Sequence, residues 1–171
     1  MEKSTSKAAG IIRTHGRSVP QKFTFAMGHL FIVLTCGWLI YGKGWEVIGQ
    51  AFGKSWQITD IPRAQILLVC AFIYWLRHVL TLFYLLVRKV EWSEVLGLLI
   101  FIGLFEIGLV LLGGGAFRDY SIKFGLLDIV ALVLFFLGSY LNSASEIQRK
   151  WWKAAPTHHG LCYTKGLFAY S

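Results

Sequence analysis

Four long apolar stretches constrain the fold of this chain more than any other feature. They cover residues 23–41, 64–87, 95–112 and 124–141. The hydrocarbon core of a bilayer is about 30 Å thick, which about 20 helical residues cross at about 1.5 Å per residue. In lipid, each backbone N–H and C=O must be bonded within its own segment, and none of the stretches alternates as a barrel strand does. The sequence therefore predicts an all-α integral membrane protein, an antiparallel bundle of about four transmembrane helices with short connections.

The composition excludes a water-soluble domain, because 56% of the residues are hydrophobic and only 15% are charged. Residues 1–22 contain five Lys and Arg residues and a single acid, Glu2. No apolar segment followed by a cleavage site precedes the first span, so no cleaved signal peptide is expected. We therefore divide the chain into a basic N-terminal arm (1–22), a transmembrane bundle (23–141) and a polar C-terminal segment (142–171).

The basic residues predict the orientation in the membrane. Eleven of the seventeen Lys and Arg residues fall on the side that holds both termini, five fall on the other side, and Arg77 lies inside a span. The positive-inside rule places both termini in the cytoplasm. The membrane is expected to be that of the endoplasmic reticulum or a bacterial inner membrane. The net charge of +8 does not indicate nucleic-acid binding, since no soluble domain gathers these cations into a groove. Anionic membrane lipids are the partners expected for the arm.

The second span carries a polar stripe. Its members recur at intervals of three or four residues, which places them on one helix face: Tyr74, Arg77, Thr81, Tyr84 and Arg88. A charge near the bilayer centre is costly, so Arg77 is expected to face the bundle or a wet cavity. Counting residues from the predicted span ends puts Arg77 and Glu106 at a similar depth of about 15 Å. We therefore expect them to form an ion pair, either structural or as part of a substrate cavity.

Three other residues in the spans carry weaker expectations. His78 lies off the polar stripe and is expected to pack with a hydrogen bond rather than to act in catalysis. Asp128, near the start of the fourth span, is expected to be solvated or to pair with Arg118 or Lys123. Tyr84 is suited either to donate a proton to a substrate or to anchor the helix at the interface.

The polar C-terminal segment offers a phosphate-binding pattern. Asn142 and Glu146 are one helical turn apart and project from the same face. Arg149, Lys150 and Lys153 supply the cations that a pyrophosphate and an additional 2′-phosphate require. An amphipathic helix lying at the membrane surface, with Trp151 and Trp152 in the interface, explains the same residues without a ligand.

Metal and soluble nucleotide sites are not indicated by any motif. His158, His159 and Cys162 are close in sequence, but adjacent histidines point in different directions and no fourth ligand is near. The chain has no GxSxG, HExxH, P-loop or GxGxxG pattern, so common hydrolase and soluble dinucleotide-binding classes are excluded. We therefore expect no bound metal.

The segment from Asn142 to Ser171 resembles the start of the cofactor-binding half of the steroid 5-alpha-reductase family of membrane enzymes. The resemblance lies in an Asn, an acid four residues later, basic residues, and a Gly-Leu-Phe turn. It implies that NADPH is the cofactor. The binding residues that it implies are Asn142, Glu146, Arg149, Lys150, Lys153, Tyr163, Gly166, Leu167 and Phe168. Residues 1–141 are similar to the family only in hydropathy and topology.

The resemblance implies reduction of a carbon–carbon double bond in a lipid or sterol-like substrate by NADPH. Glu106 and Tyr84 are the nearest chemical equivalents of the family's catalytic Glu and Tyr, although no motif around them matches. The family would continue after Ser171 with an Asn-Tyr-Phe-Gly-acid stretch and further helices, so the chain is expected to be such a reductase or a truncated form of one. Two alternatives remain: an isoprenylcysteine methyltransferase-like enzyme that uses S-adenosylmethionine, and a small non-catalytic membrane protein. The sequence does not indicate whether the chain forms an oligomer.

Overall fold

The computed structural model describes residues 7–8, 11–12, 18–158 and 161–170, and it is built from helices. The α-helices are α1 (Val19–Tyr41), α2 (Gly44–Ala51), α3 (Ile61–Leu80), α4 (Trp92–Gly113) and α5 (Leu126–Lys153). A π-helix, η1 (Thr81–Leu85), continues α3, and two 3-10 turns follow α5, namely η2 (Pro156–His158) and η3 (Gly166–Tyr170). The two-residue strands β1 (Lys7–Ala8) and β2 (Ile11–Ile12) pair antiparallel before α1.

Four of these helices are long and apolar enough to cross a membrane, which confirms the coarse prediction from the sequence. They are Val19–Tyr41, Ile61–Leu85, Trp92–Gly113 and Leu126–Lys153. The first three begin about three residues before the predicted spans, where Pro20 and Pro62 occupy the first turns of α1 and α3. The largest difference is in α5, which continues to Lys153 through residues assigned to the C-terminal segment. Polar residues extend this helix because helix propensity does not depend on hydrophobicity.

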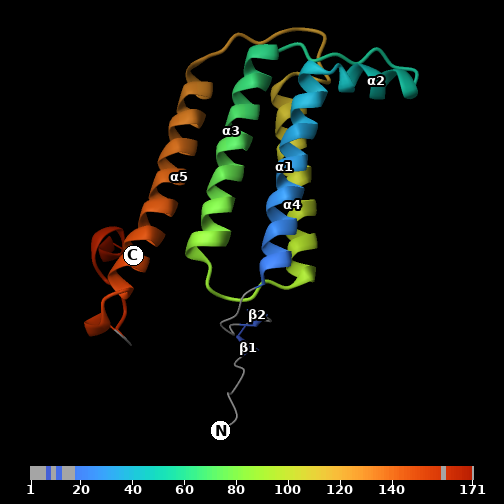
Figure 1. Cartoon of the computed structure of the whole chain (residues 1–171). Coiled ribbons are helices and arrows are strands. Elements are labelled where there is room, and N and C mark those ends of the chain that lie inside the picture. Colours follow the sequence, from blue (N-terminus) through green and yellow to red (C-terminus); the bar gives the residue numbers. More distant parts are fainter. Residues whose placement is uncertain (1–6, 9–10, 13–17, 159–160, 171) are drawn as a thin grey trace.

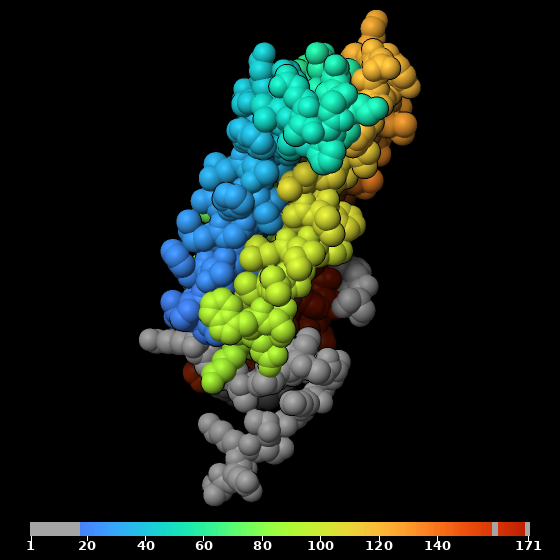
Figure 2. Space-filling view, turned by 90° about the vertical axis from the view of Figure 1, so that its right-hand side faces the viewer, coloured from blue at the N-terminus to red at the C-terminus, as the bar shows by residue number. Residues whose placement is uncertain are grey.

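The core consists of α1, α3 and α4, which pack closely against one another. Figure 1 shows these helices together, with α5 standing to one side along α3. Figure 2 shows α1 and α4 side by side, with α2 across one end of the pair. We call this end, where α2 and the α4–α5 connection lie, the loop end, and the opposite end, where α1 begins and α5 finishes, the tail end (Figure 1).

The fourth long helix differs from the other three in its surroundings. No residue of α5 is buried, and Leu126 and Leu127 have relative exposures of 74% and 84%. An apolar helix left this exposed is stable in lipid, where its outer face meets hydrocarbon rather than water. This helix makes few contacts with α3, and a cavity lies between α5 and the core.

The polar stripe predicted for the second span is interrupted before its last member. At Thr81 the helix changes to π geometry, and the backbone N–H of Leu86 donates to the Thr81 carbonyl over 2.7 Å. Leu86 is already extended, so Arg88 lies beyond the helix, where it pairs with Glu94 at the start of α4. Glu94 therefore satisfies Arg88 locally, and the stripe prediction was wrong for this residue.

Tertiary hydrogen bonds fix the α3–α4 connection to α1. The Lys22 ammonium donates to the Leu86 carbonyl over 2.5 Å, and the Val90 N–H donates to the Ser18 hydroxyl over 3.0 Å. Both side chains at the start of α1 are buried. The tail end of the core is thus closed by polar contacts to backbone groups that no helix satisfies.

Candidate functional site

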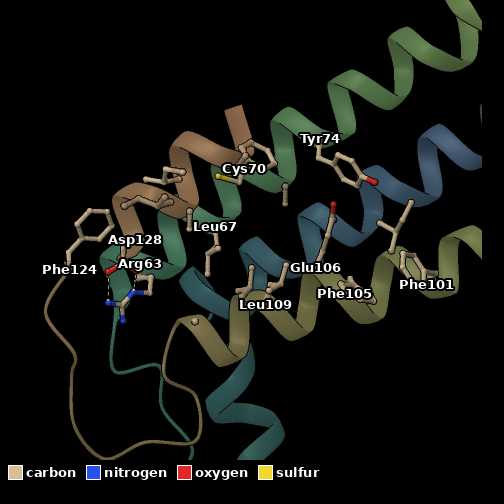
Figure 3. Close-up of a pocket in the computed structure, with 18 residues that line it drawn as sticks. Arg63, Leu67, Cys70, Tyr74, Phe101, Phe105, Glu106, Leu109, Phe124 and Asp128 are labelled. Carbon is tan, nitrogen blue, oxygen red and sulfur yellow. Dashed lines mark hydrogen bonds and ion pairs between the residues drawn. The ribbon is translucent and has the colours of Figure 1, made fainter. Parts of the chain in front are cut away.

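A cavity of about 510 Å³ lies between α3, α4 and α5. Its volume falls in the range of about 300–1,000 Å³ that is typical of small-molecule sites. Of the eighteen lining residues, thirteen are apolar, and Figure 3 shows Phe101, Phe105 and Leu109 on the α4 wall. The remaining five carry polar side-chain atoms: Arg63, Cys70, Tyr74, Glu106 and Asp128.

Four of these polar residues form two groups along the cavity, and Cys70 lies between the groups. Arg63 and Asp128 are joined toward the loop end, beside Phe124 (Figure 3). Glu106 points from α4 toward α3, in the half of the cavity where Tyr74 lies (Figure 3). The cavity is therefore a largely apolar space with one polar group at the loop end and a second, Glu106 with Tyr74, further toward the tail end.

We call the half of the cavity nearer the tail end its deep half. Among the described residues that line it, Glu106 is the only acid, and it is 7% exposed. Its Oε1 lies 2.8 Å from His29 Nε2 on α1, whose side chain is fully buried. Its Oε2 has no hydrogen-bond partner among the described residues. Because a buried polar atom without a partner costs about 1–3 kcal/mol, a ligand that brought a polar group to this oxygen would gain from the contact.

A second histidine extends the pair away from the cavity. His78 Nδ1 on α3 lies 3.2 Å from His29 Nδ1, so one of the two nitrogens donates to the other. Tyr74 and Phe25 contact the His78 ring edge-on, with centroids 4.3 and 5.4 Å away. This hydrogen-bonded packing agrees with the role expected for His78. The chain of Glu106, His29 and His78 joins all three core helices in their apolar interior.

The predicted ion pair between Arg77 and Glu106 is not present, so this prediction was wrong. Among the described residues, the Arg77 guanidinium lies over the Tyr74 ring, 4.7 Å from its centroid, and forms no ion pair. The depth estimate failed because η1 ends at Leu85 and α4 begins at Trp92, which leaves Arg77 about 12 Å and Glu106 about 21 Å from the tail end. His29 occupies the position beside Glu106 instead.

Asp128 has a different partner from either of the two expected. Arg63 Nε donates to its Oδ1 over 2.8 Å, and Arg63 Nη2 donates to its Oδ2 over 3.0 Å. Arg118 pairs with Asp60 over 2.6 Å, and Lys123 contributes its backbone carbonyl to Arg63. Asp128 also accepts the Gly125 N–H over 2.9 Å and so caps α5. The bidentate pair fastens α5 to α3.

The Asp60 side chain binds several groups of the α4–α5 connection at the loop end. Its carboxylate accepts the Ser121 hydroxyl over 2.5 Å and the Ile122 N–H over 3.1 Å. The Ser121 hydroxyl, the Ile122 N–H and the guanidinium groups of Arg118 and Arg63 hold the pKa of Asp60 below its ordinary value, although burial opposes the shift. The loop-end wall of the cavity therefore depends on an ionised carboxylate.

The C-terminal segment folds back onto the last turns of α5. His158 stacks on Trp152, with ring centroids 4.0 Å apart, and Tyr163 lies 5.3 Å from Trp152 and 5.5 Å from Phe168. The Leu167 N–H donates to Gln148 Oε1 over 3.5 Å. His159 lies outside the described residues. The Gly-Leu-Phe turn thus lies beside the polar end of α5.

Some side chains of this predicted cofactor segment are bound to other residues of the chain, and others are not. Arg149 is paired with Glu146, and the Lys150 ammonium donates to the Tyr84 carbonyl. Asn142 and Lys153 are exposed, and their side chains have no partner in the described part of the chain. Trp152 Nε1 is buried and has no acceptor among the described residues. Among the described residues, Asn142 and Lys153 therefore have a free amide and a free ammonium, and the Trp152 indole N–H is unpaired.

Tyr84 does not line the cavity and is not brought to Glu106. Its hydroxyl accepts the Trp151 Nε1–H over 2.9 Å, and the Lys150 ammonium lies over its ring, 3.5 Å from the centroid. These contacts join η1 to the tail end of α5. The interfacial role expected as the alternative describes Tyr84 better than a place beside Glu106.

Three contributors to these sites are not singled out by the sequence analysis: His29, Gln148 and Arg63. His29 is an ionisable residue inside an apolar span, a signal that by itself marks a candidate functional residue. Gln148 and Arg63 form hydrogen bonds with residues that lie 19 and 65 positions away in the sequence, and no local spacing indicates such pairs.

The fold and the cavity define a class of protein, namely one with four apolar helices long enough to span a membrane and a largely apolar cavity between three of them. Comparison with known proteins adds no family to this class, because no protein-family model, curated protein or solved structure matches the chain. Its function is therefore argued from the site itself.

Proposed function

We propose that this chain is part of a multi-pass membrane reductase that uses NADPH to reduce a carbon–carbon double bond of a lipid or sterol-like substrate. The observation that carries the proposal is the apolar cavity with a single buried carboxyl, Glu106, at its deep end. Such a cavity suits a lipid-soluble molecule, and an unpaired carboxyl oxygen suits the one polar group that such a molecule must place.

The face of α5 that lines the cavity continues toward the predicted cofactor segment. Phe135 lines the cavity, and Asn142 lies seven residues further along the same helix. Seven residues are about two turns, so the two side chains share a face about 10 Å apart. A substrate in the cavity and a nicotinamide beside Asn142 could therefore approach each other along α5.

The residues at the tail end of α5 fit a dinucleotide. Lys153 and Asn142 are exposed and free among the described residues, and the Trp152 indole N–H lacks an acceptor. Gly166 has a φ of 61°, and a Cβ there would lie 2.8 Å from the Tyr163 hydroxyl, so the turn has no room for a side chain. Lys150, Arg149 and Lys153 would meet the phosphates, with NADPH favoured over NADH because three cations are present.

In this proposal the tail end faces the cytoplasm, where NADPH is available. The basic residues support this orientation, since the described tail end carries Lys22, Arg88, Lys89, Arg149, Lys150, Lys153 and Lys165. Bound NADPH supplies a hydride. The chain's own residues exclude water around the substrate, and Glu106 orients the substrate through its free oxygen, held in place by His29.

Cofactor binding tests the proposal directly. The full chain is reconstituted in lipid nanodiscs, and NADPH and NADH are titrated while the nicotinamide fluorescence is recorded. We expect NADPH to bind more tightly than NADH, and Lys153→Gln to weaken NADPH binding about tenfold, as loss of one charged contact predicts. Lys89→Gln is the matched control, since Lys89 is exposed at the tail end but outside the segment.

Turnover is then measured as NADPH oxidation with a 3-oxo-steroid enone and with a long-chain enoyl compound. Glu106→Gln should slow the preferred reaction while NADPH binding stays unchanged, because Glu106 lies in the cavity and not in the tail. Absence of NADPH binding, or equal binding of NADH, would contradict the assignment of the cofactor segment.

A further inference from the structure

The loop end of the cavity is polar, but its charges balance. At the loop end, Arg63 and Arg118 balance Asp60 and Asp128. An anionic headgroup would meet two carboxylates there, and a cationic one would meet two guanidinium groups. The charge balance therefore favours a neutral polar group at this end.

The hydrogen-bonding capacity at the loop end is nearly, but not fully, used. Arg63 donates one bond to Asp60, two to Asp128 and one to the Lys123 carbonyl, which leaves one of its five N–H groups free. Asp128 accepts two bonds from Arg63 and one from Gly125, and a carboxylate has about four acceptor positions. The unused Arg63 N–H is on Nη1, away from the Nε and Nη2 groups that bind Asp128, so a hydroxyl at this end would donate to the remaining acceptor position of Asp128 Oδ1.

The Glu106 side chain in the deep half can also bind a hydroxyl group. Glu106 Oε2 is unpartnered, and Oε1 is engaged with His29. The chain of His78, His29 and Glu106 can place the shared protons so that Oε2 either accepts or carries a proton. A hydroxyl satisfies Oε2 in both arrangements because it is both a donor and an acceptor.

The spacing of the two ends follows from α4. A Cβ built on Gly113 would lie 4.0 Å from Arg63 Cδ, so Gly113 marks the level of the loop-end group. Glu106 precedes Gly113 by seven residues, which corresponds to about 10 Å along the helix. Between these levels the α4 wall consists of Leu109 and Val110, with no polar side chain.

We infer that the cavity binds a neutral, lipid-soluble molecule with a hydroxyl group near each end, the two oxygens about 10 Å apart. One hydroxyl binds Glu106 Oε2, and the other donates to Asp128 Oδ1 beside the ion pair of Asp128 with Arg63. The inference rests on the proposed function only in taking this molecule as the substrate, since the binding itself requires no cofactor.

Linear diols are the probes for this inference. Hexane- to dodecane-length diols, the single alcohols of equal length and the dimethyl ethers of the diols are compared without NADPH. Binding is followed as protection of Cys70 from a thiol reagent, because Cys70 lines the cavity. Cys162, which is exposed, is replaced by Ser, and Cys36 is fully buried.

We expect affinity to peak at the diol whose oxygens lie about 10 Å apart, with about tenfold weaker binding of the matching single alcohol. Glu106→Leu should reduce this diol to the affinity of the single alcohol, whereas Glu91→Leu, an exposed acid outside the cavity, should not. Steady tightening with chain length and no advantage of the diol would overturn the inference. The ligand series in the unsubstituted cavity decides the matter even if Glu106→Leu fails to fold. A failed NADPH titration leaves this result unaffected.

Discussion

His29 Nε2 lies 2.8 Å from Glu106 Oε1, so a histidine of α1 and a carboxyl of α4 meet in the apolar interior of the bundle. The pair uses one oxygen of Glu106 and leaves the second without a partner among the described residues. His78 on α3 fixes the orientation of the His29 ring through the other nitrogen.

Removal of His29 should destabilise the bundle strongly. His29→Leu leaves the Glu106 carboxyl buried without a partner, and breaking such a pair from one side costs about 3–5 kcal/mol. Glu106→Leu should cost less, since His29 keeps its bond to His78. The double variant should be more stable than the sum of the two losses predicts, which thermal or detergent unfolding in a double-mutant cycle measures. Strictly additive losses would show that the pair is not coupled.

Acid should loosen the loop end through Asp60. Because its folded pKa is lowered, its contribution to stability is fully present above the unfolded value of about 3.9 and is lost as the pH falls through the folded pKa. The melting temperature should therefore fall below about pH 4. Asp60→Asn should reduce the melting temperature at neutral pH and remove this part of the pH dependence.

Asp119→Asn is the control for Asp60, because Asp119 is an exposed acid in the same connection and has no partner among the described residues. It should leave the pH profile of the melting temperature unchanged. Identical profiles for Asp60→Asn and the unsubstituted chain would show that the Asp60 contacts do not stabilise the fold.

Gly166→Ala should detach the C-terminal segment from α5. A non-glycine residue at a φ of 61° costs about 1–2 kcal/mol, and the added Cβ would also collide with the Gln148 side chain and the Tyr163 hydroxyl. Trypsin should then cleave faster at Lys165 than in the unsubstituted chain. Gly53→Ala shares the positive φ of 65° but has open space around its Cβ, so it controls for backbone strain at a different site. Equal cleavage rates for Gly166→Ala and the unsubstituted chain would contradict this packing.

Ala131→Phe should fill the cavity. Ala131 lines it from α5, and a benzyl group there would occupy the space of a ligand, so the diol should no longer protect Cys70. Val133→Phe adds a comparable side chain on an exposed position of α5 that does not line the cavity, and it should leave protection intact. Protection that survives Ala131→Phe would place the ligand elsewhere.

The helices were predictable because hydropathy depends on residues that are adjacent in sequence. All four long apolar helices are present, and the errors are in their ends: the π-turn at Thr81–Leu85 and the polar extension of α5 to Lys153. The end of the second helix at Leu85 and the start of α4 at Trp92 leave Arg77 and Glu106 about 9 Å apart in depth, because each helical residue adds about 1.5 Å. The pairing prediction depended on depth alone and therefore failed.

The sequence by itself determined that the chain forms four apolar helices, that Glu106 lies inside one of them, and that the residues after the last apolar stretch are polar. Only the tertiary structure decided that Glu106 meets His29, that Asp128 meets Arg63, and that α5 stands far enough from the core to leave a cavity. The reason is physical: apolar residues specify burial without specifying a partner, whereas each polar contact depends on the rotation and depth of two helices relative to each other.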